Sequence, residues 1–155
     1  MKKTIKTENV LKVYNIISQA KYSKMDDADK IKAWKALRAL KPIAQKFDED
    51  SKDAAEKLRP TEDFTERLQK AQEYERLRSN HEPTIDIMTT ADYEAFLKEF
   101  QQYNKLVGDA VKEFAAKEVE FDFEPLTEEA IGKLMASNEG WTLEQVNTIS
   151  DFLCE

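Results

Sequence analysis

The most regular hydrophobic pattern of the chain lies between residues 90 and 123. Apolar and aromatic residues recur there at alternating intervals of three and four, namely Tyr93, Phe96, Phe100, Tyr103, Val107, Ala110 and Phe114. Such a spacing predicts a long helix with one buried stripe. From Val119 onward the period becomes two, because Val119, Phe121 and Phe123 alternate with acidic residues. The pattern therefore predicts a strand that follows the helix directly and ends at Pro125.

A second long helix is expected between about residues 27 and 58. Its apolar stripe is predicted to consist of Ile31, Trp34, Leu37, Leu40, Ala44, Phe47, Ala54 and Leu58. Pro42 removes one backbone hydrogen bond and predicts a kink, but no turn-forming residue stands beside it to end the helix. Since both long helices carry an apolar stripe of similar length, we expect residues 27–58 to pack antiparallel against 91–118.

Four shorter helices and one further strand complete the expected fold. The four shorter helices are predicted to begin at the capping residues Thr7, Asp63, Thr127 and Thr142. Glu66 lies three residues after Asp63, at the spacing of a capping box, and Thr89 or Thr90 is expected to cap the long helix. Residues 79–89 form the connection that reverses the chain. In the last helix, Leu143 is expected to belong to the apolar face with Ile149 and Phe152.

Residues 3–7 are predicted to form a short strand whose lysines would face Glu120 and Asp122 if it pairs with the later strand. The predicted class is therefore mainly α (α+β), in one domain spanning residues 1–155. Its architecture is a long antiparallel helical hairpin with a small two-stranded sheet and two short C-terminal helices.

Charge is distributed unevenly along the chain, whose net charge is −7. Residues 1–47 carry 12 Lys or Arg against 4 Asp or Glu, whereas residues 48–155 carry 12 against 27. The basic helix surface at Lys32, Lys35 and Arg38 is therefore a candidate interaction surface. It can meet acidic residues of the same folded chain, of another copy or of a partner.

The residues needed for common catalytic sites are scarce. His81 is the only histidine and Cys154 the only cysteine, which leaves too few side chains for a zinc site or for two thiol–imidazole partners. The three glycines are widely separated, so no phosphate-binding loop is expected. We expect no enzyme activity, no cofactor and no metal ion. The mostly acidic chain does not favour nucleic-acid binding, and no apolar run is long enough to span a membrane.

Two stretches carry a resemblance to a known group of proteins. They are DADKIKAWKALRALKPIAQKFDEDSKDAAEKL (residues 27–58) and VEFDFEPLTEEAIGKLMASNEGWTLEQVNTISDFL (residues 119–153). In these stretches the chain resembles small uncharacterised helical proteins encoded by phages and prophages of gut Bacteroidetes, and residues 62–90 match least well. The resemblance implies a structural or assembly role in a phage, in the cytoplasm of a bacterial host or in the virion.

The expected function is accordingly that of a non-enzymatic structural or assembly protein that acts through protein–protein contacts. Its expected partners are other virion proteins or copies of itself. The alternative is a small acidic inhibitor, or nucleic-acid mimic, whose carboxylates from residue 48 onward bind a basic site on a host protein.

Overall fold

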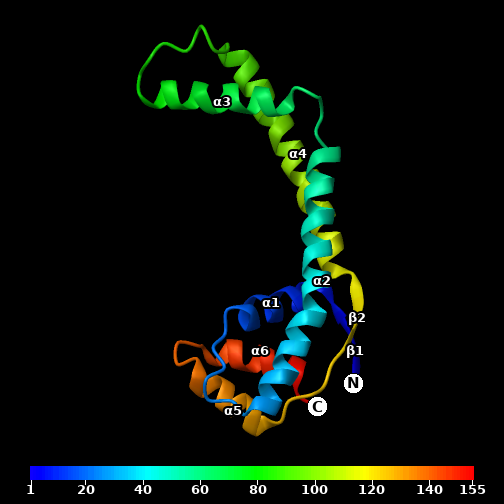
Figure 1. Cartoon of the computed structure of the whole chain (residues 1–155). Coiled ribbons are helices and arrows are strands. Elements are labelled where there is room, and N and C mark those ends of the chain that lie inside the picture. The colour runs from blue at the N-terminus through cyan, green and yellow to red at the C-terminus, as the bar shows by residue number, and fades with distance from the viewer. The chain divides into compact units, whose positions relative to one another are not determined.

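The computed structural model describes residues 1–155 as six helices and two strands (Figure 1). In chain order they are β1 (Lys2–Lys6), α1 (Thr7–Ser18), α2 (Asp27–Lys57), α3 (Phe64–Ser79), α4 (Thr90–Ala116), β2 (Glu118–Asp122), α5 (Glu128–Ser137) and α6 (Leu143–Leu153). This is the mainly helical fold predicted from the sequence, with a helical hairpin, a small sheet and two short C-terminal helices. None of the helices is long and apolar enough to cross a lipid bilayer.

The chain forms two compact units. Unit 1 contains Met1–Asp50 and Glu113–Glu155, and unit 2 contains Ser51–Lys112. The long helices α2 and α4 each contribute residues to both units. α2 continues through Pro42, as its apolar pattern predicted.

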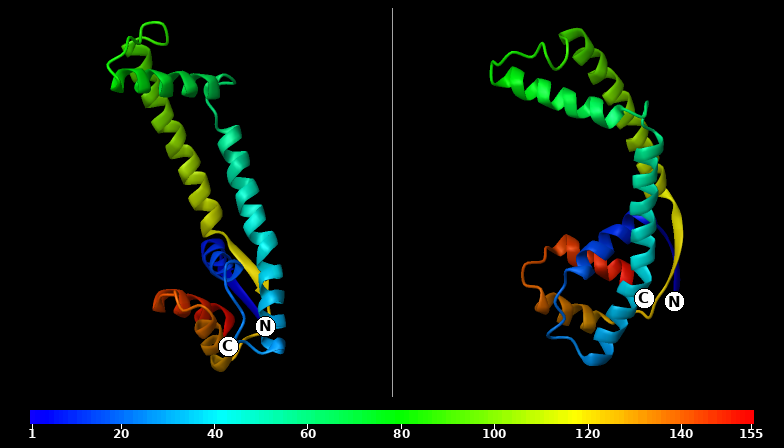
Figure 2. Two further views of the ribbon diagram at one scale, coloured as in Figure 1. Left: turned by 60° about the vertical axis from the view of Figure 1, so that its left-hand side comes forward. Right: turned by 45° about the horizontal axis from the view of Figure 1, so that its top comes forward.

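The two strands pair antiparallel in unit 1, which confirms the predicted sheet (Figure 2). On the exposed face, Lys2 stands opposite Asp122, and Lys6 opposite Glu118. On the other face, Lys3 extends to the end of α6, where its ammonium group donates to the carbonyl of Cys154 at 2.9 Å. A lysine at the C-terminal end of a helix is favourable because the last carbonyls lack partners in the helix.

The predicted role of Thr7 as a helix cap is wrong. Lys6 occupies the N-cap position of α1 without a side-chain bond, and Thr7 is the first helical residue. The Thr7 hydroxyl, on a residue only 5% exposed, instead donates to the carbonyl of Lys117 at 2.8 Å. Thr7 thus joins the start of α1 to the junction between α4 and β2.

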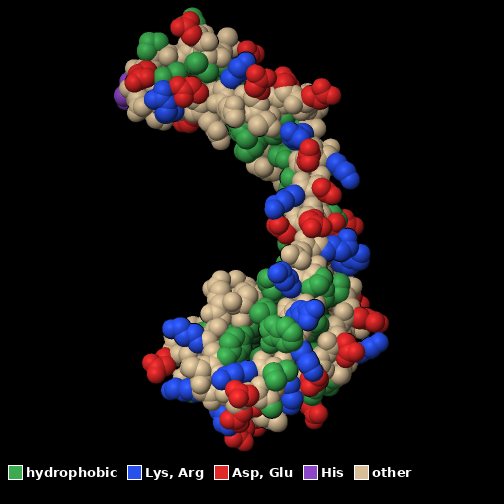
Figure 3. Space-filling model, in the orientation of Figure 1, with side chains coloured by type: hydrophobic (Ala, Val, Ile, Leu, Met, Phe, Trp, Pro, Cys, Tyr) green, Lys and Arg blue, Asp and Glu red, His purple; other side chains and the backbone are tan.

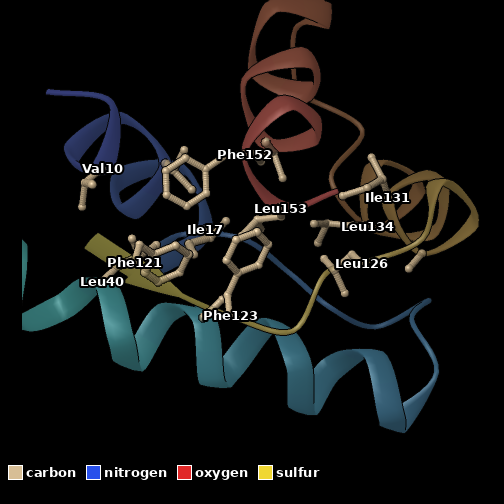
Figure 4. Close-up of a cluster of buried hydrophobic side chains, with 14 of the residues drawn as sticks. Val10, Ile17, Leu40, Phe121, Phe123, Leu126, Ile131, Leu134, Phe152 and Leu153 are labelled. Atoms are coloured by element: carbon tan, nitrogen blue, oxygen red, sulfur yellow. The ribbon is translucent and has the colours of Figure 1, made fainter. Parts of the chain in front are cut away.

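The unit 1 core is enclosed by helices on several sides of β2 (Figure 4). Its fully buried side chains come from α1, α2, β2, α5 and α6, namely Val10, Val13, Ile17, Leu40, Phe121, Leu134, Ile149 and Leu153. The rings of Phe121 and Phe152 lie 5.1 Å apart between centroids, within the range of favourable aromatic pairs. The inward face of the predicted strand is therefore the centre of this core.

The unit 2 core is an aromatic layer between α3 and α4. Phe64 of α3 lies 5.5 Å from the ring of Phe96 and 4.8 Å from that of Tyr103. The rings of Tyr74 and Tyr93 stack at 4.3 Å. The apolar partners of Tyr93, Phe96 and Phe100 therefore come from α3 and not from α2, so this part of the expected packing is wrong. Tyr103 does contact α2, because its hydroxyl donates to the carbonyl of Ala55 at 2.6 Å.

The remaining predicted caps are confirmed except one. The hydroxyls of Thr89 and Thr127 accept backbone N–H bonds at the starts of α4 and α5, and Thr142 forms a full capping box with Gln145. Asp63 occupies the N-cap position of α3, but its side chain caps no backbone group and accepts from Thr61 instead.

Candidate protein-interaction surface

The part of α2 that belongs to unit 1 has apolar residues on two opposite sides. Its buried side is formed by Ala33, Ala36 and Leu40, which are at most 4% exposed. A helix turns by about 100° per residue, so Ile31 and Trp34 lie on the opposite side. Their side chains are 53% and 55% exposed. The prediction that Ile31 and Trp34 belong to the buried stripe is therefore wrong.

Arg38 lies on the exposed side with these two residues, one turn beyond Trp34. Its guanidinium carbon is 5.3 Å from the centroid of the Trp34 ring, which is within the range of a cation–π contact. Arg38 forms no ion pair or hydrogen bond within the chain, so its N–H groups remain available to an acceptor. We call Ile31, Trp34 and Arg38 the Trp34 surface. Figure 3 shows hydrophobic side chains beside Lys and Arg side chains in this region of α2.

The structure does not bring Lys32, Lys35 and Arg38 together as one free basic surface. The Lys35 ammonium group lies 2.6 Å from Oε1 of Glu124. This hydrogen bond lowers the pKa of Glu124, and the nearby charge of Lys32 lowers it further. Lys32 itself lies toward another side of α2, with its ammonium group 4.0 Å from the carboxylate of Asp29. Of the three predicted residues, only Arg38 is unpaired.

Part of the charge separation along the sequence is neutralised inside unit 1. The N-terminal ammonium group lies 3.2 Å from Asp122, and the Lys35 ammonium group lies 2.6 Å from Glu124. These pairs join the basic N-terminal part of the chain to acidic residues 121 and 89 positions further along. Ion pairs within the folded chain therefore account for part of the uneven distribution of charge along the sequence.

A polar depression of about 680 Å³ is formed by the end of α1, the α1–α2 turn and the α5–α6 turn. Asn138 joins its two walls, because its side-chain amide donates to the carbonyl of Lys21 and accepts from the Lys21 N–H, both at 2.8 Å. The Lys24 N–H donates to the Ser137 hydroxyl at 3.0 Å. The polar groups of these turns thus hold the two turns together.

The two side chains with potential catalytic chemistry lie in different units. His81 is in the α3–α4 loop of unit 2, with a positive φ of 57°. Cys154 follows α6 in unit 1, and its Sγ lies 3.8 Å from the Ser150 hydroxyl. No group of three or more His, Cys, Asp or Glu side chains is arranged to hold a metal ion.

Sequence reasoning identified Arg38 but missed Trp34, the central residue of this surface. The signal was present in the helical spacing, because Ala33, Ala36 and Leu40 form a second stripe at intervals of three and four. Alanine contributes little hydrophobicity, so the larger Ile31 and Trp34 dominated the pattern. The small alanines are nevertheless the residues that face the core.

No protein-family model, curated protein or solved structure matches this chain. The resemblance to phage-encoded proteins and the function it implies therefore stay predictions. What the structure adds is a defined surface, made of an exposed tryptophan, an exposed isoleucine and an unpaired arginine.

Proposed function

We propose that the protein is a non-enzymatic structural or assembly protein of a phage or prophage, and that it acts through protein–protein contacts at the Trp34 surface. One observation carries this proposal, namely the exposure of Trp34 and Ile31 on the side of α2 that faces away from its own core. Tryptophan and arginine are among the residues most enriched at the positions that dominate binding energies in protein interfaces.

The contact between Arg38 and Trp34 supports the same function. An arginine stacked on an aromatic ring is held in place before binding, so less side-chain freedom is lost when a partner docks. Its N–H groups can then donate to a carboxylate of the partner in a bidentate manner. The expected partner surface therefore combines an apolar side chain with an acidic one.

The alternative of an acidic inhibitor or nucleic-acid mimic has weaker support. Its best candidate row of carboxylates is Glu118, Glu120 and Asp122, which are exposed along one face of β2. Lys2 and Lys6 of β1 stand opposite two of these three residues and reduce the negative field there. The row is therefore a poor imitation of a phosphate backbone.

Photo-crosslinking tests the proposal directly. A photoreactive amino acid is placed at position 34, or at exposed Gln45 on the same side of α2 about three turns away, in cells that produce the protein natively. We expect a discrete protein adduct from position 34 and none from position 45. Equal labelling at both positions, or no protein adduct from position 34, would rule out the Trp34 surface as the contact.

Mass spectrometry of purified phage particles tests the assembly part of the proposal. We expect the protein, or its position-34 adduct, in particles or in assembly intermediates. A position-34 adduct formed only with a host protein that is absent from particles would favour the inhibitor instead.

A further inference from the structure

A tight turn in unit 2 presents an exposed isoleucine next to an exposed aspartate. The N–H groups of Ile87 and Met88 both donate to the carbonyl of Thr84, at 3.0 and 3.2 Å. Ile87 and Met88 pack against the aromatic core of unit 2, which anchors the turn. Ile85 is 82% exposed, and Asp86 beside it is also exposed. The chain therefore holds this isoleucine out in solvent on an ordered turn.

The chemistry of this turn complements that of the Trp34 surface. Ile85 offers a branched apolar side chain suited to contact the exposed Trp34 ring. The Asp86 carboxylate forms no ion pair or hydrogen bond within the chain and can accept from the Arg38 guanidinium group. Each surface thus supplies one apolar group and one charge, and the two charges are opposite.

From this complementarity we infer that the partner of the Trp34 surface is a second copy of the same chain. Ile85 of one copy packs on Trp34 of the next, and Asp86 of the first copy pairs with Arg38 of the second. This inference rests on the proposed function, since it names the partner of the same surface. The contact joins two different surfaces, so it can be repeated from copy to copy.

The size of the two surfaces limits the strength of this contact. Two half-exposed apolar side chains and one arginine cover less than the roughly 800 Å² per partner of a stable interface. We therefore expect weak association, with a dissociation constant in the micromolar range or above. Weak contacts of this kind give stable structures when many copies make them together.

Leu143 and Glu144, at the start of α6, form a rival pair of exposed apolar and acidic residues. Leu143 is 77% exposed, contrary to its predicted place in the apolar face. Glu144 lies in the first turn of α6, where the helix dipole already stabilises its charge. Asp86 lies outside the helices, so no helix dipole stabilises its charge before it pairs with Arg38.

Analytical ultracentrifugation of purified protein over a concentration series tests the inference. We expect the weight-average mass of the wild-type protein to rise with concentration and to fall again in high salt, which screens the pair of charges. Trp34→Ser and Ile85→Ser should each weaken association by more than about tenfold. Leu143→Ser is the matched control and should associate like the wild type. Far-UV circular dichroism checks that every variant keeps its helices.

Mixing the two deficient variants is the decisive step. Trp34→Ser keeps an intact Ile85 turn, and Ile85→Ser keeps an intact Trp34 surface, so their mixture should form one-to-one dimers although neither associates alone. An Arg38→Asp, Asp86→Arg double variant should likewise regain association that each single change removes.

Three outcomes would overturn the inference: a wild-type chain that stays monomeric at all concentrations, loss of association in Leu143→Ser but not in Ile85→Ser, and no dimer in the mixture. A protein adduct from position 34 together with a monomeric wild type would leave the proposed function standing with a different partner. If position 34 gives no protein adduct and the wild type stays monomeric, the proposed function and this inference are both wrong.

Discussion

The hydrophobic cores of the two units differ in how completely they are enclosed. Unit 1 encloses its core with five elements, and side chains such as Leu40, Leu134 and Ile149 are 0% exposed. Unit 2 has a single aromatic layer between α3 and α4, in which Phe100 and Tyr103 remain partly exposed. Since stability follows the apolar area removed from water, the comparison predicts that unit 2 opens more easily than unit 1.

Unit 2 supplements its thin core with charged hydrogen bonds at the edge of the aromatic layer. Arg67 pairs with both carboxylate oxygens of Glu99 and lies 5.3 Å from the ring of Phe96. The Tyr93 hydroxyl donates to Glu75 at 2.7 Å, which raises the pKa of Tyr93. Such bonds fix the orientation of rings that packing alone holds loosely.

Leu134→Ala should give the largest loss of stability. The side chain is fully buried in unit 1, so its truncation leaves a cavity and should cost about 3–5 kcal/mol of unfolding free energy. Denaturant unfolding followed by circular dichroism measures this loss. Met135→Ala is the matched control, because the neighbouring side chain is 43% exposed. Equal losses in the two variants would contradict the enclosed core.

Phe100→Ala should cost less, about 2 kcal/mol, because its ring is only partly buried against Phe64 and Phe96. Hydrogen exchange should show faster exchange in α3 and in the part of α4 within unit 2, with little change at Leu134. Leu97→Ala, which removes an exposed neighbour, is the control. Uniform acceleration across both units would show instead that they unfold as one.

Thr7→Val removes a buried hydroxyl from unit 1 and should cost about 1 kcal/mol. The loss is limited because the Lys117 carbonyl still accepts from the Thr7 N–H at 2.9 Å. Thermal melting of this variant and of Thr4→Val, at an exposed strand position, measures the difference. A Thr7→Val protein as stable as Thr4→Val would show that the hydroxyl contributes nothing to the junction.

Lys35→Met should have the smallest effect on stability, because it breaks an exposed ion pair. The hydrogen bond from Lys35 lowers the pKa of Glu124, so its stabilising contribution is present above the ordinary glutamate pKa and is lost as the pH falls below about 4. NMR titration should show a higher Glu124 pKa in Lys35→Met than in the wild type. The control Lys46→Met should leave it unchanged, and a shift of equal size there would contradict this cause.

The sequence predicted the elements better than their partners. The change of period at Val119 located β2, and the hydroxyls of Thr127 and Thr142 located two helix starts. A periodic stripe shows that one face is buried but does not say against which element, so the choice of α2 rather than α3 for Phe96 was wrong. Tyr74, which stacks on Tyr93, was missed although it continues the helical spacing of Phe64, Leu68 and Ala71.

The candidate surface also could not be predicted fully from the sequence. Lys32, Lys35 and Arg38 were chosen from charge alone, and charge does not reveal which lysines find acceptors after folding. The acceptor of Lys35, Glu124, lies 89 positions further along the chain, so no local pattern could reveal the pair. One turn before Arg38 the chain places Trp34 and not a carboxylate, and the guanidinium group lies over that ring.

The arrangement of the two units along the sequence has a consequence for how the protein folds. Unit 2 is continuous, whereas unit 1 needs both ends of the sequence, and Lys6 must meet Glu118 across all of unit 2. Joining the ends of a long flexible loop is slow, so early folding of unit 2 would shorten the effective loop and speed the pairing of β1 with β2. During synthesis, β1 and the apolar face of α1 therefore wait unpaired until the last quarter of the chain emerges, and a ribosome-bound nascent chain is most prone to aggregate in that interval.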